Sequence, residues 1–186
     1  MKSICGLVVS LCTIAGCAGF DATEHVDTRI TAYAQPEPFP GKRFVLQGPD
    51  PSHTGGDPSW PVYARIVTRA LEAKGFVFVE SSPDLLIQVT YSVGDTGITN
   101  ITSTSVISST LRTIQLEAID ATSHAVGGPK VVWSVRARSR GTEDDLEKVF
   151  PFIVAAMEDY IGATAPQEVS VSKYDNDKEA SRLQKP

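Results

Sequence analysis

Cysteine is scarce in this chain of 186 residues, and it is confined to one end. Cys5, Cys12 and Cys17 all lie within the first 17 residues, and none follows. The long remainder of the chain therefore forms no internal disulfide bond and no thiolate metal site. Its folded part must depend on a hydrophobic core for its stability.

The sequence also lacks a run of about 20 apolar residues, the length that a transmembrane helix needs. A shorter apolar run, Ile4–Thr13, follows the positive charge of Lys2 and leads into small residues, which is typical of a secretory signal peptide. The run ends in Ile14-Ala15-Gly16-Cys17, which resembles a bacterial lipobox. In lipoproteins of this kind the cysteine sulfur carries a diacylglycerol and the signal is cut before it. An ordinary signal peptide, in which Cys17 has no special role, is the alternative.

The lipobox divides the chain into four predicted parts. These are a lipoprotein signal peptide at 1–16, a lipidated tether at 17–27, a single domain at 28–163 and a flexible polar tail at 164–186. Two or three acyl chains would make anchoring effectively permanent, because each buried methylene contributes about 0.8 kcal/mol. Lipoproteins kept at the inner membrane often have Asp after the lipidated cysteine. Ala18 stands there in this chain, so we expect the periplasmic face of the outer membrane.

Basic residues are outnumbered, with 17 Lys and Arg against 22 Asp and Glu. Cleavage before Cys17 would leave 170 residues and remove only Lys2, which makes the net charge −6. Nucleic acid is therefore not an expected partner, because binding to phosphate backbones needs a basic surface. The length suits one domain with extended ends.

Recognisable catalytic equipment is missing as well. His25, His53 and His124 fall in the predicted tether, a loop and a turn, and no His-x-x-x-His pair or carboxylate cluster suits zinc or calcium. There is no Gly-x-Ser-x-Gly elbow and no glycine-rich phosphate loop. We therefore expect no cofactor and no enzymatic activity, although a catalytic triad assembled by folding stays open.

Two helices are predicted from apolar residues spaced three and four apart. The first spans about 59–74 and ends at Gly75; its apolar stripe is Tyr63, Ile66, Val67, Ala70 and Leu71. The second follows a cap at Thr142, with Pro151 kinking it or delaying its start. Its stripe is Leu146, Phe150, Ile153, Met157 and Ile161.

Six strands are predicted at 28–34, 42–46, 76–79, 85–93, 111–120 and 131–140. Several alternate apolar and polar residues, which is typical of a sheet with one wet face. The predicted fold class is α+β, a mostly antiparallel sheet with two helices packed on one face. Residues 94–110 are rich in Ser and Thr and form either a loop or a long hairpin; their β-branched side chains favour the extended form.

One polar pattern indicates a binding surface. Arg136, Arg138 and Arg140 are two residues apart on a predicted strand, so their side chains share one face. Three guanidinium groups in a row could bind a phosphate, a lipid headgroup or an acidic peptide. The alternative is a solvated face on which these arginines pair with residues such as Glu117 on a neighbouring strand.

Several short segments, with the lipobox and the early Tyr33 strand, resemble the domain of unknown function 4136 family of bacterial envelope lipoproteins. They are Ala64-Arg65-Ile66-Val67, Leu71-Glu72-Ala73-Lys74-Gly75-Phe76, Ser82-Pro83-Asp84-Leu85-Leu86-Ile87, Ile119-Asp120-Ala121 and Val131-Val132-Trp133. The resemblance spans about 20–163. It implies an envelope lipoprotein without an established activity, and it supplies no catalytic residues.

The expected function is that of a membrane-anchored, non-enzymatic accessory or interaction protein of the cell envelope. Its partners would be the membrane, through lipid on Cys17, and an unidentified envelope protein, to which residues 94–110 could offer an edge strand. The alternative is a lipid or small-molecule binding module with a pocket between the sheet and the helices.

Overall fold

A computed structural model of the chain describes residues 25–36, 39–49, 57–102, 105–125, 127–174 and 177–185. Within 95–108, it describes only the backbone. The predicted signal peptide, Cys17 and His53 lie outside the described residues. Within the described ranges, no helix is both long and apolar enough to span a membrane.

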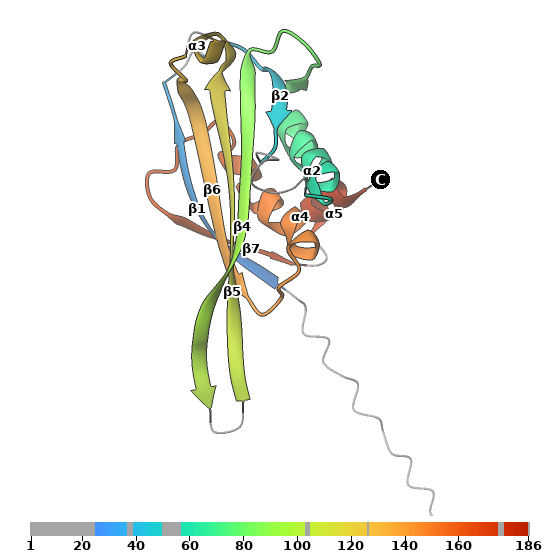
Figure 1. The fold of residues 1–186 in the computed structure, drawn as a ribbon, viewed down its shortest axis with the longest axis vertical. Coiled ribbons are helices and arrows are strands. Elements are labelled where there is room, and N and C mark those ends of the chain that lie inside the picture. The colour runs from blue at the N-terminus through green and yellow to red at the C-terminus, as the bar shows by residue number, and fades with distance from the viewer. Residues whose placement is uncertain are drawn as a thin grey trace, which may run out of the picture.

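Seven strands form a single sheet in the order β3-β2-β4-β5-β6-β1-β7 (Figure 1). The strands are β1 (His25–Ala34), β2 (Arg43–Gln47), β3 (Val77–Phe78), β4 (Leu85–Thr102), β5 (Ser105–Asp120), β6 (Val131–Gly141) and β7 (Val169–Tyr174). The helices are α2 (Trp60–Ala73), α3 (Ala121–Ala125), α4 (Leu146–Met157) and α5 (Lys178–Gln184), with a 3₁₀ turn, η1, at Glu158–Tyr160.

The predicted fold class is wrong in its sheet and in its helix count. The sheet is mixed, because β2 runs parallel to both of its neighbours, β3 and β4, while the other four pairings are antiparallel. The described residues contain four α-helices instead of two, although the fold is still α+β. After β2 the chain passes through α2 before it enters β3. Such a helical crossover places the following strand parallel to the first one. Alternation within β2 reveals which face is buried but not the direction of the strand.

The expected flexible tail is folded over most of its length. β7 pairs antiparallel with β1, from His25 opposite Tyr174 to Ile30 opposite Val169. Helix α5 then buries Ala180 and Leu183 completely. The alternation of Val169 and Val171 with Ser170 and Ser172 is short and α5 has only two turns, so the polar composition of the segment favoured a solvated tail.

Helix α2 has the apolar stripe that the sequence predicts. Tyr63, Ile66, Val67, Ala70 and Leu71 are its buried residues. The helix ends as expected at Gly75, whose φ of +80° is a left-handed conformation that glycine adopts without strain. The amide of Phe76 donates to the carbonyl of Leu71 at 3.1 Å, which closes the last turn.

Helix α4 begins later than its predicted cap at Thr142. Asp145 takes that role, and its Oδ1 accepts a hydrogen bond of 2.9 Å from the amide of Glu147. Pro151 lies inside the helix and is buried. Glu143 and Asp144 therefore precede the helix and do not lie in its first turn.

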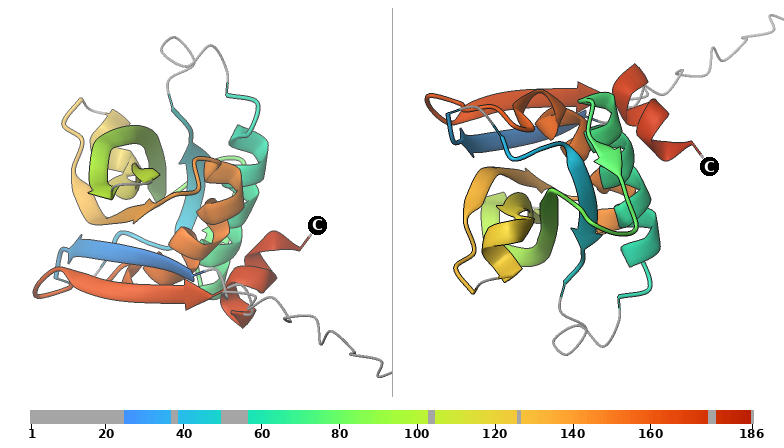
Figure 2. Two further views of the ribbon diagram at one scale, coloured as in Figure 1. Left: turned by 90° about the horizontal axis from the view of Figure 1, so that it is seen from below. Right: turned by 90° about the horizontal axis from the view of Figure 1, so that it is seen from above.

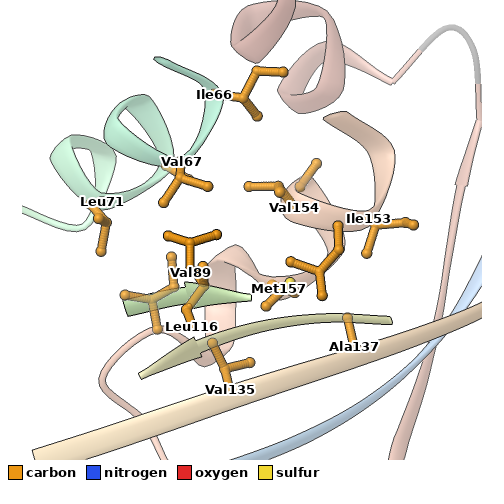
Figure 3. Packing of buried hydrophobic residues seen from close by; sticks show 14 of the residues in the cluster. Ile66, Val67, Leu71, Val89, Leu116, Val135, Ala137, Ile153, Val154 and Met157 are labelled. Atoms are coloured by element: carbon orange, nitrogen blue, oxygen red, sulfur yellow. The ribbon is translucent and has the colours of Figure 1, made fainter. Parts of the chain in front are cut away.

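The core lies between one face of the sheet and the helices α2, α4 and α5, which gather on that side (Figure 2). Figure 3 shows Ile66, Val67 and Leu71 of α2, Ile153, Val154 and Met157 of α4, and Val89, Leu116, Val135 and Ala137 of the sheet packed together. We call this the inner face of the sheet. The opposite side of β1, β5 and β6 is its open face.

Residues 94–110 form a hairpin, which decides between the two predicted forms. β4 and β5 stay paired as far as Thr102 opposite Ser105. The register shifts between Asp95 and Ile98 and again between Ile98 and Asn100. The hairpin extends away from the helices, at the same end of the molecule as the start of β1 (Figure 1).

Candidate functional site

The three arginines singled out in the sequence lie on the open face. On β6 the exposed side chains of Arg136, Arg138 and Arg140 alternate with buried Val135, Ala137 and Ser139. The regular pleat of the strand produces this arrangement, because successive side chains point to opposite faces. The core-facing residues thereby hold the three guanidinium groups on one side of the sheet.

A groove of ≈ 580 Å³ is hollowed into the open face where β1, β5, β6 and β7 lie together. We call it the arginine groove. Its lining residues are Asp27, Thr28, Arg29, Leu111, Arg138, Arg140, Glu168 and Ser170. A second hollow of ≈ 250 Å³ follows along the same strands, lined by Thr31, Ala32, Tyr33, Gln115, Glu117, Ser134 and Arg136.

Both carboxylates of the arginine groove already have partners. Glu168 Oε1 lies 3.6 Å from Nη1 of Arg29. Asp27 accepts a hydrogen bond from the hydroxyl of Ser172, and its other oxygen lies 3.5 Å from Nε2 of His25. These contacts leave neither carboxylate paired with an arginine of β6.

In the paired registers, neither Arg138 nor Arg140 is opposite an acidic residue. Arg138 is opposite Arg29 on β1, and Arg140 is opposite Leu111 on β5. Within the described parts of the chain, neither guanidinium forms an ion pair or a side-chain hydrogen bond. Like charges directly opposite one another destabilise a sheet. The groove thus contains two guanidinium groups without an ion pair in the described residues.

Arg136 has a different environment. Its Nε donates to Oε1 of Gln115 at 2.7 Å, and Nε2 of Gln115 donates to Oε1 of Glu117 at 2.6 Å. Glu117 is therefore linked to Arg136 through Gln115. This is close to the alternative made from the sequence, in which the arginines pair with residues such as Glu117 on a solvated face. That interpretation fits Arg136 but not Arg138 or Arg140.

Sequence reasoning missed the contribution of β1 and β7 to the groove. The alternation of Asp27, Arg29, Thr31 and Tyr33 along β1 carries a period-two signal that could have placed them beside the β6 arginines. Glu168 and Ser170 belong to a shorter alternation of the same kind, with Val169 and Val171 between the polar residues. They reach the groove only because β7 pairs with β1.

Around Val67, Leu116 and Ile153, side chains fill the space between the sheet and the helices. Core residues of both layers, including Val67, Leu116 and Ile153, have no exposed surface. Both hollows described above open on the other face. In the ranges that the structure describes, no group of three His, Cys, Asp or Glu residues could hold a metal ion.

Comparison with known proteins identifies a family. Residues 42–160 match the family described as a domain of unknown function, DUF4136, and this span is more than half of the chain. The chain belongs to the DUF4136 family. The resemblance found in the sequence is thereby confirmed. No curated protein matches this DUF4136 chain.

Solved structures resemble the DUF4136 chain at low identity. A PDZ domain protein from Parabacteroides distasonis is 15% identical with a TM-score of 0.52, and the match covers 81% of this chain but 39% of that one. This similarity shows a shared fold alone. A PelC dodecamer from Paraburkholderia phytofirmans is 14% identical with a TM-score of 0.44, over 74% of this chain and 99% of that one. A minor lipoprotein from Acinetobacter baumannii, also 14% identical, has a TM-score of 0.34, over 65% and 84%.

Proposed function

We propose that this DUF4136 protein is a lipid-anchored lipoprotein of the cell envelope that works without catalysis, by binding a phosphate-bearing ligand in the arginine groove. One observation carries the binding role: Arg138 and Arg140 line the groove with no ion pair in the described parts of the chain. The hydroxyl of Ser170 and the guanidinium of Arg29 supply further donors at the same groove.

Guanidinium groups suit such a ligand because their fork of N–H donors matches the oxygens of a phosphate group. Side chains two residues apart on a strand stand about 7 Å from each other, so Arg138 and Arg140 can reach oxygens of one ligand. Leu111 contributes an apolar part of the wall. A ligand with adjacent phosphate and hydrocarbon groups fits this mixed lining.

The anchor in this proposal is lipid on Cys17. Its support is the lipobox, Ile14-Ala15-Gly16-Cys17, together with the lack of any later cysteine that could pair with Cys17. Ala18 supports the outer membrane as the destination, with the domain at its periplasmic face. Anchoring brings the groove close to a surface rich in phosphate groups. An envelope protein that carries phosphate or carboxylate groups is the other class of partner.

Calorimetric titration with inorganic pyrophosphate tests the groove. The lipidated protein is held in nanodiscs of neutral phosphatidylcholine. The test variant is Arg138→Gln/Arg140→Gln. The control is Arg65→Gln/Lys130→Gln, which removes the same charge from exposed residues outside the groove. We expect the first double variant to bind about tenfold more weakly or worse, since two charge-assisted contacts are lost. The second should bind like the wild type.

Equal affinity of the two double variants for pyrophosphate would contradict the proposed role of the groove. Nanodiscs that contain phosphatidylglycerol then identify the source of the phosphate. If lipid headgroups occupy the groove, these nanodiscs should weaken pyrophosphate binding by the wild type and leave the Arg138→Gln/Arg140→Gln variant unaffected. Unchanged binding by the wild type would indicate a soluble ligand.

A further inference from the structure

Three polar side chains form a row across the inner face of the sheet, on the side opposite the exposed guanidinium groups of β6, and one of them, Thr28, also borders the arginine groove. Arg112 of β5 is opposite Ser139 of β6, and Ser139 is opposite Thr28 of β1. Their exposed fractions are 2%, 2% and 1%. They are the only buried polar or charged residues in the parts of the chain for which burial is described. We call them the buried polar row.

Each member of the buried polar row has an atom without a hydrogen-bond partner. Among the described residues, four buried side-chain nitrogen and oxygen atoms are unpartnered, and three of them are Nε of Arg112, Oγ of Ser139 and Oγ1 of Thr28. Buried polar atoms are almost always hydrogen-bonded in folded proteins. Three exceptions in adjacent strands therefore indicate that these atoms share one ligand.

The charge of Arg112 is not balanced by a neighbouring acid. Glu143 is close enough to raise the pKa of Arg112 through its charge, but burial has the larger, lowering effect on that pKa. The carboxylate of Glu143 is held instead by Nζ of Lys148 at 3.2 Å and by the amide of Asp145 at 3.0 Å. A buried charge without a partner destabilises a protein strongly.

The position of the guanidinium group is constrained by the backbone. A Cβ atom on Gly141 would lie 2.5 Å from Nη2 of Arg112, so the guanidinium packs directly against this glycine. Side chains opposite one another in a sheet have Cβ atoms about 5 Å apart. Ser139 lies between the other two, so a small ligand above Ser139 would be about 5 Å from the Cβ atoms of both Arg112 and Thr28, within reach of the free atoms of all three.

The chemistry of the row selects the class of that ligand. An arginine N–H and two hydroxyl groups can all donate hydrogen bonds, and the row has one positive charge and no negative charge. A water molecule could accept at most two of these hydrogen bonds and would leave the charge of Arg112 uncompensated. We propose that the buried polar row binds a small monovalent anion, such as chloride, held by Arg112, Ser139 and Thr28. The near-complete burial of the row excludes larger anions.

Thermal unfolding in two salts tests this site. The lipidated protein in phosphatidylcholine nanodiscs is unfolded in sodium chloride and in sodium gluconate at equal ionic strength, followed by tryptophan fluorescence. Arg138→Gln/Arg140→Gln serves as the background, so that the arginine groove does not contribute. A ligand at ten times its Kd should raise the Tm in chloride by about 3–6 °C, whereas gluconate is too large to enter.

Substitutions within and beside the row identify the source of the shift. Arg112→Met, which keeps the length of the side chain without its charge, should abolish the chloride effect. Ser139→Ala should reduce it by at least half, and Ser134→Ala, on the same strand but lining the second hollow of the open face, should leave it unchanged. The comparison of Ser139→Ala with Ser134→Ala remains decisive if Arg112→Met does not fold.

Either of two results of thermal unfolding would overturn the proposal. One is a Tm that is the same in chloride and in gluconate. The other is an equal chloride response in Ser139→Ala and Ser134→Ala. Crystals grown in sodium bromide provide a direct check, in which we expect an anomalous peak within hydrogen-bond distance of Arg112, Ser139 and Thr28. A water molecule at that place, or nothing, would also overturn it. None of these outcomes depends on the arginine groove.

Discussion

At the scale of single residues, the contact between Arg43 and Asp84 shows how a polar pair ties two strands together. Asp84 Oδ2 accepts from the amide and from Nε of Arg43 at 3.0 and 3.2 Å, and Oδ1 accepts from Nη2 at 2.8 Å. Arg43 begins β2, and Asp84 directly precedes β4. These hydrogen bonds lower the pKa of Asp84 below its usual value. The ionised carboxylate thus aligns two parallel strands at their start.

Replacement of this carboxylate should have a pH-dependent effect on stability. We expect Asp84→Asn to lower the free energy of unfolding at pH 7 by about 1 kcal/mol, a value kept low because Arg43 is half exposed. Asp84 has a folded pKa below the unfolded value of about 3.9. Its contribution is therefore complete above that value and is lost as the pH falls through the folded pKa.

Urea unfolding of the wild type and of Asp84→Asn at pH 7 and near pH 3 measures this effect. The difference between the two proteins should shrink at the lower pH. Asp144→Asn, at an exposed position, is the matched control and should change little at either pH. A difference that is the same at both pH values would show that the ionised form of Asp84 is not the stabilising one.

At the scale of elements, the C-terminal helix α5 adds two buried residues to the core that the sheet forms with α2 and α4. Asp177 caps α5 by accepting hydrogen bonds from the amides of Glu179 and Ala180. The helix presents Ala180 and Leu183 to the core, and neither is exposed. Arg182 forms an ion pair with Glu158 in η1. The helix is therefore attached through apolar burial, with polar contacts around it.

Truncation of the buried leucine in α5 should destabilise the whole domain. We expect Leu183→Ala to lower the free energy of unfolding by about 2–4 kcal/mol, because it leaves a cavity between α5 and the core. Lys178→Ala, on an exposed position of the same helix, should stay within about 0.5 kcal/mol of the wild type. Chemical denaturation of both variants measures the difference. Equal stability of the two would mean that α5 does not pack on the domain in solution.

At the scale of the whole molecule, the two faces of one sheet differ, because one holds the apolar core and the other holds the groove that we propose for binding. The inner face and its helices hold the apolar core, and the open face holds the arginine groove. β1 contributes to both, since Ile30 is buried in the core and Arg29 lines the groove. The chain enters β1 only eight residues after Cys17, a distance of at most about 29 Å when extended. Lipid on Cys17 would thus hold the whole domain close to a membrane.

Metabolic labelling with an alkyne fatty acid tests the anchor in intact cells. The wild type should incorporate the label, and Cys17→Ser should lose it, because the serine oxygen does not replace the thiol in lipidation. Cys12→Ser is the matched control and should stay labelled, since that residue lies in the segment predicted to be removed. Equal labelling of the wild type and Cys17→Ser would contradict lipidation at this residue.

The sequence by itself determined those features that depend on a short, regular spacing. The stripe of α2, its end at Gly75, the faces of β6 and the burial of Trp133 all follow from periods of 3.6 or 2 within single elements. Membership of the DUF4136 family was also predictable from the order of short segments. Each of these signals is local, so no knowledge of distant residues is needed to see it.

Only the tertiary structure decided what depends on neighbours far apart in the sequence. The parallel direction of β2, the docking of β7 and α5 and the separation of Arg136 from Arg138 and Arg140 belong to this class. So does the buried polar row, whose residues lie on three different strands. An alternating pattern states which side chains share a face, but strand order and direction determine which charges meet. That order is set by crossover connections and by the filling of the core, which act on the whole chain at once.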